Sequence, residues 1–187
     1  MNLRSATPDN PLPDAGALAP VVPTVVDRPA MPDGYGVENA TVTLGWESVA
    51  AKLAASKHYW LGSVRPDGTP HAIPRWGVWV DNRFFYDGAP TTVHARNLEA
   101  NPACTLTLES GTDVVIVEGT SVAVRALGDG FGSRLAQAFG KYHDLDYQPG
   151  AASWESPTDG GGLRVITPHR AMAWSKFPED CTRFRFH

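Results

Sequence analysis

Alternating apolar and polar positions between residues 58 and 119 predict short strands joined by tight turns. In the turn 65–70, Pro66 presets φ and Gly68 is free to take a positive φ, so the chain should reverse sharply. A second reversal is expected at Asp81-Asn82, because both residues tolerate the left-handed conformation of a two-residue hairpin. This succession of short antiparallel strands predicts a small β-barrel.

Helical spacing of apolar residues predicts two helices beside these strands. The first covers residues 46–57, and the second covers residues 127–142. Further strands are expected at 163–166 and 171–174, with an interruption at Pro168, and at 182–186. The pattern is therefore that of a mainly β protein of the α+β class.

Residues 1–40 differ from the rest of the chain, because they hold seven of its sixteen prolines and little periodic pattern. We expect an extended or disordered arm there and one folded domain over residues 41–187. Cys104 and Cys181 are far apart and lack the CxxC spacing, which favours a reducing compartment.

Composition excludes several partners of the 187-residue chain. A net charge of −4 argues against general nucleic-acid binding. No apolar run is long enough to span a bilayer, and the first residues lack the apolar core of a signal peptide. We therefore expect a cytoplasmic protein without a membrane partner.

Familiar catalytic motifs are missing. The sequence contains no Gly-x-Ser-x-Gly elbow and no phosphate-binding loop followed by Lys-Ser/Thr. The six histidines lack the spacings of metal ligands, so no metal site and no catalytic residue are predicted.

Residues 88–98 have the composition of an anion site. A short helix should begin after Thr91 or Thr92, and its first backbone N–H groups would face outward with the positive end of the helix dipole. His94 and Arg96 add ionisable side chains to that end. An ordinary capped helix with Arg96 in solvent is the alternative reading of the same residues.

The segment 71–79 allows two interpretations. Pro74 cannot donate to a sheet, so pairing should be interrupted there and the backbone left open to a ligand. Gly77 permits close approach by a flat group. Trp76 and Trp79 are suited either to stacking on a ring system or to packing in the core.

The order of these motifs resembles the pyridoxamine 5′-phosphate oxidase-like, FMN-binding split-barrel superfamily, in its branch of flavin and deazaflavin oxidoreductases. The resemblance covers about residues 45–187. It rests on Trp60-Leu61-Gly62-Ser63-Val64, Asp67-Gly68-x-Pro70-His71, Pro74-x-Trp76-Gly77, Phe85-Tyr86, His94-Ala95-Arg96-Asn97-Leu98-x-x-Asn101-Pro102, Val117-Glu118-Gly119, and the segments 166–174 and 182–186.

The resemblance implies a six-stranded antiparallel split barrel with flanking helices that forms a homodimer, with a cofactor at each of two sites between the subunits. Residues 73–78 would lie along the cofactor ring, and the start of the short helix would hold its phosphate. The implied cofactor-binding residues are Ile73, Pro74, Arg75, Trp76, Gly88, Thr91, Thr92, His94 and Arg96.

The implied function is hydride transfer between coenzyme F420 or FMN and a small organic substrate, with the deazaflavin slightly favoured. The cofactor carries out such chemistry without a general acid or base from the protein. Two features depart from the family. His94 stands where many members have lysine, which would make phosphate affinity depend on pH, and the basic and tryptophan motifs of vitamin B6 oxidation are not reproduced near residues 183–186.

Other outcomes remain open at this stage. A non-catalytic flavin- or haem-binding barrel is the main alternative, and a barrel whose cofactor site has decayed is another. His71, Tyr142 and Trp154 are candidates for a substrate opening, although aromatic loop residues more often pack in the core.

Overall fold

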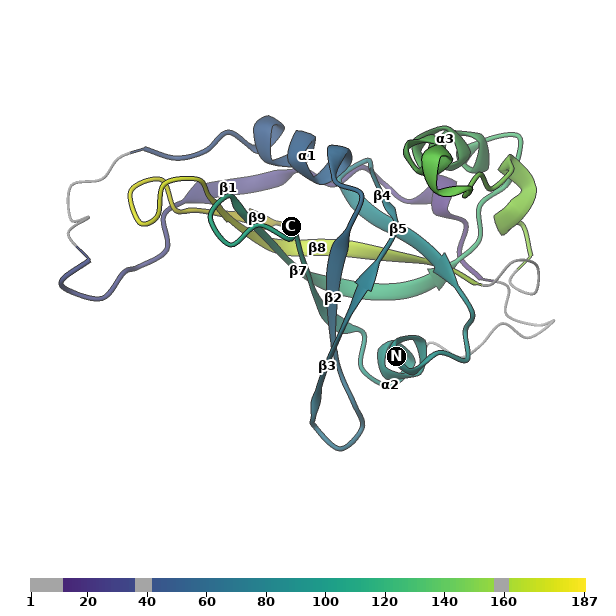
Figure 1. Cartoon of the computed structure of the whole chain (residues 1–187), viewed down its shortest axis with the longest axis horizontal. Helices are drawn as coiled ribbons and strands as arrows, with labels where there is room; N and C mark the ends of the chain where they lie inside the picture. The colour runs from purple at the N-terminus through teal and green to yellow at the C-terminus, as the bar shows by residue number, and fades with distance from the viewer. Residues whose placement is uncertain (1–11, 36–41, 157–161) are drawn as a thin grey trace.

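The computed structural model describes residues 12–35, 42–156 and 162–187, and in them one antiparallel sheet of nine strands dominates (Figure 1). The order of hydrogen-bonded neighbours is β1-β9-β8-β7-β6-β2-β3, while β4 pairs with β5 and β5 also pairs with β8. The strands are β1 (Pro23–Asp27), β2 (Tyr59–Val64), β3 (Pro70–Arg75), β4 (Val78–Val80), β5 (Arg83–Gly88), β6 (Ala103–Thr107), β7 (Val114–Val124), β8 (Gly162–Trp174) and β9 (Thr182–Phe186).

In the described residues three α-helices flank the sheet, while one 3-10 helix precedes β1 and two others lie between β7 and β8. In Figure 1, α1 and α3 lie above the sheet as drawn and α2 lies below it. The mainly β, α+β class is thus confirmed. The helices are α1 (Trp46–Ala55), α2 (Val93–Ala100), α3 (Phe131–Phe139), η1 (Ala15–Ala17), η2 (Gly140–Leu145) and η3 (Ala151–Trp154). None of the described helices is long and apolar enough to cross a membrane.

Both predicted turns are present with the expected backbone conformations. Gly68 has φ +85° between β2 and β3, and the carboxylate of Asp67 accepts a hydrogen bond from the Thr69 backbone N–H at 2.9 Å. Asp81 and Asn82 have φ of 51° and 57°, which is the hairpin geometry required between β4 and β5. These turns depend only on local residues, and the sequence therefore predicts them well.

The described residues form nine strands rather than the six that the family resemblance implied, and the segment 71–79 is divided between β3 and β4 with a break at Trp76-Gly77. The hydroxyl of Tyr142, 65 residues away, accepts a hydrogen bond from the Gly77 N–H at 2.8 Å and replaces a ladder partner there. The predicted interruption at Pro74 is wrong, since Pro74 pairs with Trp60 in a continuous register. β3 ends the order of paired strands, and a proline is tolerated on such an edge strand.

Pro168 does not interrupt the last part of the sheet, as the sequence analysis expected. β8 continues through it, and the register with β7 shifts between Glu118 and Gly119, so that Pro168 faces Gly119 and Arg170 faces Glu118. The bulge leaves His169 as the extra residue of β8 and accommodates a proline without ending the strand.

Two clusters of buried side chains form the core. The first fills the space between β2, β5, β6, β7 and α1, and includes Leu61, Phe84 and Leu106. The second lies between α3, η3 and β4, β5 and β8, and includes Val78, Phe85 and Phe139. Trp79 belongs to the first cluster, so its role is core packing.

The predicted helices are confirmed, with shifted ends. α1 buries Val49 and Leu53, as the spacing indicated. α3 begins at Phe131 rather than at Leu127, which is 39% exposed, and beyond Phe139 the chain tightens into η2. Cys104 and Cys181 are both buried as free thiols.

Residues 12–35 of the proline-rich segment follow the sheet edge. β1 pairs antiparallel with β9, and the carboxylate of Asp27 accepts hydrogen bonds from Arg183 and Arg185. Arg28 donates to backbone carbonyls of Val42 and Pro178 at 2.8 and 2.9 Å. The parts of the predicted arm at residues 1–11 and 36–40 lie outside the described residues, and its boundary at residue 40 stays a prediction.

Candidate functional site

The start of α2 lies where the sequence predicts an anion site. Thr92 is the N-cap residue, but its hydroxyl donates to the Ala89 carbonyl at 2.9 Å and makes no capping bond to the helix within the described structure. The N–H groups of Val93, His94 and Ala95 therefore receive no capping side chain from Thr92. Unsatisfied N–H groups and the positive helix dipole favour an anion at this position.

His94 lies behind this helix start and is only 4% exposed. Its Nε2 is 3.4 Å from the Thr92 hydroxyl oxygen, and its ring is 5.9 Å from the ring of Tyr86. Burial lowers the pKa of His94 to about 4, and the nearby charges of Arg75 and Arg164 act in the same direction. The imidazole is therefore neutral at pH 7, and an anion would take its positive charge from other residues.

Arg75 brings a cation to the same place from the end of β3. Its guanidinium lies over the Tyr86 ring, with Cζ 5.0 Å from the ring centre, and donates to the Asp87 backbone carbonyl. Gly88 leaves room for it, because a Cβ there would be 2.9 Å from Arg75 Nη2. Among the described residues Arg75 forms no ion pair, and its buried Nε has no hydrogen-bond partner.

Arg96 contributes a second cation at the surface of α2. Its Nη1 donates to the Thr91 carbonyl at 3.1 Å, and the side chain is exposed. The structure thus gathers six of the nine predicted site residues around one helix start. We call Arg75, Gly88, Thr91, Thr92, His94 and Arg96 the α2 anion cluster.

The three remaining predicted residues lie along β3 and just after it. Ile73 is partly buried against the first core cluster, and Pro74 is exposed. Trp76 is 39% exposed and stacks on Tyr142, with ring centres 5.3 Å apart and an angle of 17° between the planes. One face of Trp76 is therefore already covered by the protein itself.

Gly77 does not have the role that the sequence analysis gave it. A Cβ at Gly77 would lie 2.3 Å from Cζ of the Phe84 ring and 2.6 Å from the Phe85 carbonyl oxygen. The flat group that approaches Gly77 is thus the buried ring of Phe84. Gly77 and Val78 are buried, so any ligand ring along this segment is limited to the residues before them.

Two long-range contacts fix α2, and neither was predicted from the sequence. Arg164 on β8 is 6% exposed, pairs with Glu99 of α2 and donates through Nε to the Ser121 hydroxyl at 3.2 Å. Asn97 of α2 donates to the Ser63 hydroxyl at 3.1 Å. These partners are 65, 43 and 34 residues apart in the sequence, so they leave no local signal.

Asp87 holds the loop after α3 against the same end of the barrel. Its Oδ2 accepts hydrogen bonds from the Tyr147 hydroxyl at 2.5 Å and from the Trp154 indole at 2.8 Å. Burial raises the pKa of the Tyr147 hydroxyl, and the Asp87 carboxylate raises it further. Tyr142 and Trp154, named as candidates for a substrate opening, are 0% and 2% exposed and serve as core residues.

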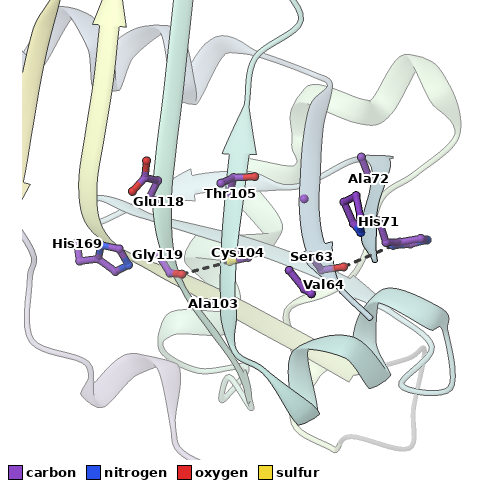
Figure 2. A pocket seen from close by; sticks show the side chains of 12 residues that line it. Ser63, Val64, His71, Ala72, Ala103, Cys104, Thr105, Glu118, Gly119 and His169 are labelled. Carbon is purple, nitrogen blue, oxygen red and sulfur yellow. Dashed lines mark hydrogen bonds between the residues drawn. The ribbon is translucent and has the colours of Figure 1, made fainter. Parts of the chain in front are cut away.

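His71, the third of those candidates, lies at a cavity. The cavity has a volume of about 430 Å³ and lies on the sheet between the strands β3, β2, β6 and β7 and the bulge of β8. Figure 2 shows His71 and Ser63 at one side of it and Glu118 and His169 at the other, with Cys104 and Thr105 between them. We call it the β2–β6 cavity. Its lining is Gly62, Ser63, Val64, Pro70, His71, Ala72, Ala103, Cys104, Thr105, Glu118, Gly119 and His169.

Comparison with known families identifies the chain. Residues 46–164, more than half of the sequence, match the pyridoxamine 5′-phosphate oxidase family. The chain belongs to this family of FMN-binding split barrels, which confirms the resemblance drawn from its motifs. Among curated proteins no significant match was found.

Solved structures agree with the fold. The conserved hypothetical protein Rv2991 from Mycobacterium tuberculosis is 18% identical, with a TM-score of 0.57 over 73% of this chain and 88% of that one. A putative pyridoxamine 5′-phosphate oxidase from Listeria innocua is 14% identical, with a TM-score of 0.52 over 70% and 98%. An FAD-binding protein from Mesorhizobium loti is 17% identical, with a TM-score of 0.52 over 75% and 93%.

Proposed function

We propose that this chain is an oxidoreductase that binds coenzyme F420 or FMN and transfers hydride between it and a small organic substrate. Membership of the pyridoxamine 5′-phosphate oxidase family supports a flavin-type cofactor. The observation that carries the proposal is the α2 anion cluster. Arg75 has no ion pair in the described structure and lies beside the start of α2. The side chain of the N-cap residue Thr92 bonds the Ala89 carbonyl and makes no capping bond to this helix.

The chemistry of this cluster fits a phosphate group. Phosphate oxygens accept hydrogen bonds from backbone N–H groups at a helix start and from guanidinium groups. The residues that would hold the phosphate are Thr91, Thr92, Arg75 and Arg96, while neutral His94 would supply one further hydrogen bond. The unpartnered Nε of Arg75 shows that the guanidinium is not fully satisfied within the described part of the protein.

The ring of the cofactor would lie along β3, before the break at Trp76-Gly77. Ile73 and Pro74 provide apolar surface there, and the free face of Trp76 provides aromatic surface. The bound cofactor supplies the hydride chemistry, so the protein has to bind it, orient it and exclude water. Asp87, through Tyr147 and Trp154, holds the aromatic loop beside this surface and keeps it in place.

The experiment that tests the phosphate assignment compares FMN with riboflavin, which has the same ring and lacks the phosphate. Fluorescence titration of purified protein would give a Kd for FMN, riboflavin and F420 in the wild type, Arg96→Ala and Arg75→Gln. We expect both variants to bind FMN about 10- to 100-fold more weakly and riboflavin equally well, since a charge-assisted hydrogen bond contributes roughly 1.5–3 kcal/mol.

The matched control is Arg134→Ala, which removes an exposed arginine that pairs with Asp81 on another part of the surface. Its affinity for FMN should equal that of the wild type. An unchanged FMN affinity in folded Arg96→Ala and Arg75→Gln would overturn the phosphate assignment. Selective tight binding of F420 or of FMN would identify the cofactor.

The second candidate function is a non-catalytic flavin- or haem-binding barrel. The observation in its favour is the fold of a heme binding protein from Mycobacterium smegmatis, which matches with a TM-score of 0.52 at 17% identity over 79% of this chain and 59% of that one. Stoichiometric cofactor binding without turnover on a panel of electron acceptors would favour it. Reduction of any acceptor at the expense of the bound cofactor would favour the oxidoreductase.

A further inference from the structure

The last three residues of β5 surround the guanidinium group of Arg75. Arg75 Cζ is 5.0 Å from the centre of the Tyr86 ring, and the Asp87 backbone carbonyl accepts a hydrogen bond from Arg75 Nη2. Gly88 leaves the space that this group occupies, because a Cβ there would lie 2.9 Å from Nη2. We call Tyr86-Asp87-Gly88 the β5 cradle. The Tyr86 ring also lies 5.9 Å from the ring of His94, so the cradle joins Arg75 to the start of α2.

The β5 cradle is held in place by its surroundings. All three of its residues are paired with β8 in a continuous antiparallel register. The Tyr86 ring is 1% exposed and stacks on Phe84, with ring centres 5.8 Å apart and an angle of 25° between the planes. The carboxylate of Asp87 accepts the hydrogen bonds from Tyr147 and Trp154. A cradle that is fixed in this way restricts the position of the guanidinium group that it contacts.

The contacts that hold Arg75 leave its charge without a counter-ion. A ring face and a backbone carbonyl carry no net charge, and Arg75 forms no ion pair with any described residue. A cation over an aromatic face is stabilised by the negative face of the ring quadrupole. An anionic ligand at the start of α2 would therefore not have to displace a carboxylate of the described protein from Arg75.

The ring of Tyr86, and not its hydroxyl group, makes the contact with Arg75. No hydrogen bond joins the hydroxyl to Arg75 within the described part of the chain. Burial raises the pKa of this hydroxyl to about 12, so Tyr86 is neutral at pH 7. Phenylalanine at this position would present the same aromatic face, whereas leucine would fill part of the space without one.

We propose that Tyr86 is a positioning residue for anion binding, because its ring holds the guanidinium group of Arg75 beside the start of α2, where the phosphate of the cofactor binds. Tyr86 is buried and acts through Arg75 rather than through a contact of its own with the ligand. This inference rests on the proposed function, and it assigns part of the phosphate affinity to a residue behind the binding surface.

The test compares FMN with riboflavin, because the ratio of their Kd values isolates the contribution of the phosphate. Fluorescence titration of the full chain would give both values in the wild type, Tyr86→Leu, Tyr86→Phe, Gly88→Ala and Phe85→Leu, and urea unfolding would show which variants are folded. Where the protein selects F420, this cofactor and its phosphate-free chromophore form the equivalent pair. Phe85→Leu is the matched control, since Phe85 is a buried aromatic residue of β5 that packs against Phe131 in the second core cluster.

We expect Tyr86→Leu to raise the Kd of FMN about 5- to 10-fold and to leave that of riboflavin unchanged, since it removes a buried cation–π contact. Tyr86→Phe and Phe85→Leu should keep the wild-type ratio. Gly88→Ala should weaken FMN binding by a similar factor without loss of stability. The three atoms nearest to its new Cβ all belong to the Arg75 guanidinium, which is the end of a flexible side chain.

A double-mutant cycle separates positioning of Arg75 from a general effect on structure. In the Arg75→Gln background, Tyr86→Leu should not change the ratio of the FMN and riboflavin Kd values any further, because the side chain that it positions is absent. A further change of the same size in that background would overturn the proposal.

Two other results would also overturn it. The first is a wild-type ratio in folded Tyr86→Leu, or in Gly88→Ala if Tyr86→Leu does not fold. The second is a loss of FMN affinity in Tyr86→Phe equal to that in Tyr86→Leu, which would assign the effect to the hydroxyl group. The two proposals fail in different ways. Weaker FMN binding in Arg75→Gln with a wild-type ratio in Tyr86→Leu removes only the positioning role, whereas a wild-type ratio in Arg75→Gln removes the phosphate contact of Arg75 as well.

Discussion

At the start of α2, the residues that carry positive charge differ from the residue whose protonation changes with pH. Arg75 and Arg96 carry the positive charge, whereas His94 is buried and its pKa of about 4 keeps it neutral. Anion binding at neutral pH would therefore rely on the arginines. The low pKa of His94 moves the pH dependence of phosphate affinity, expected from the sequence, to acidic pH.

The first prediction concerns the stability of the folded protein between pH 5 and 7.5. The folded pKa of His94, about 4, lies below the ordinary value of 6.5, so the unfolded chain binds more protons in this range. The contribution of His94 is fully present above pH 6.5 and is lost as the pH falls toward 4. Between pH 7.5 and 5 the loss should be about 2 kcal/mol in the free energy of unfolding.

Urea unfolding of the wild type and His94→Gln at both pH values would check this. The variant should lose about 2 kcal/mol less than the wild type on acidification, because it lacks the titrating ring. His143→Gln, at an exposed position, is the control and should behave as the wild type does. Equal pH dependence in His94→Gln and the wild type would contradict the assignment.

Among the secondary-structure elements, the bulge between β7 and β8 depends on a residue without a side chain. A Cβ at Gly119 would lie 2.4 Å from the Thr167 carbonyl oxygen, which is backbone and cannot rotate away. The close approach of the strands at this point is what lets β8 pass through Pro168 and remain paired.

The second prediction is therefore that Gly119→Ala lowers the free energy of unfolding by about 2–3 kcal/mol, as overpacking against rigid backbone does. Gly111→Ala is the matched control, because a Cβ there meets no atom of the described residues within 4 Å. That variant should be neutral or slightly stabilising. Denaturant unfolding of both variants measures the difference, and equal stabilities would refute the role given to Gly119.

Elements that depend on neighbouring residues could be predicted from the sequence, and those that depend on distant partners could not. Gly68 and Asp81-Asn82 encode their turns locally, and α1 follows from apolar spacing. The break at Trp76-Gly77 depends on Tyr142 and Phe84, and the bulge at Pro168 depends on β7. The residues next to this break and this bulge in the sequence therefore do not predict either of them.

The candidate site follows the same division. The α2 anion cluster is mostly one continuous segment, so its residues could be predicted together. The orienting contacts of Asn97 with Ser63 and of Arg164 with Glu99 join elements far apart in sequence. The β2–β6 cavity draws on four strands and a bulge, and of its lining residues only His71 was named beforehand as a candidate for a substrate opening.

For the whole molecule, the first strand of the sheet contributes to the stability of one edge. β1 covers β9, and the pKa of Asp27 is lowered to about 2 by hydrogen bonds from Arg183 and Arg185. The third prediction is that removal of residues 1–28 exposes the N–H and C=O groups of the β9 edge and makes the protein prone to association. Hydrogen exchange of Thr182–Phe186 should become faster, whereas that of Ala103–Thr107 should not change. Unaltered exchange in β9 would contradict this.

The fourth prediction concerns assembly. We propose a homodimer, as the family resemblance implied, and an exposed apolar surface on β2 and β3 supports it. Trp60 and Val64 on β2 are 43% and 37% exposed, and Pro70 and Pro74 on the neighbouring edge strand are also exposed. Light scattering should give twice the chain mass of 20.1 kDa, and Trp60→Glu should give the monomer. A stable wild-type monomer would count against a cofactor site between subunits.

The pairing of β1 with β9 also sets the order in which the protein is able to fold during synthesis. Asp27 and Arg185 are 158 residues apart, so β1 leaves the ribosome long before β9, its partner strand in the described residues, exists. Pairing over such a sequence distance is slow, because a long loop must close before the contact forms. Until then β1 is unpaired and accessible to a chaperone. Pairing of β1 with β9 is therefore a late step in the folding of the nascent chain.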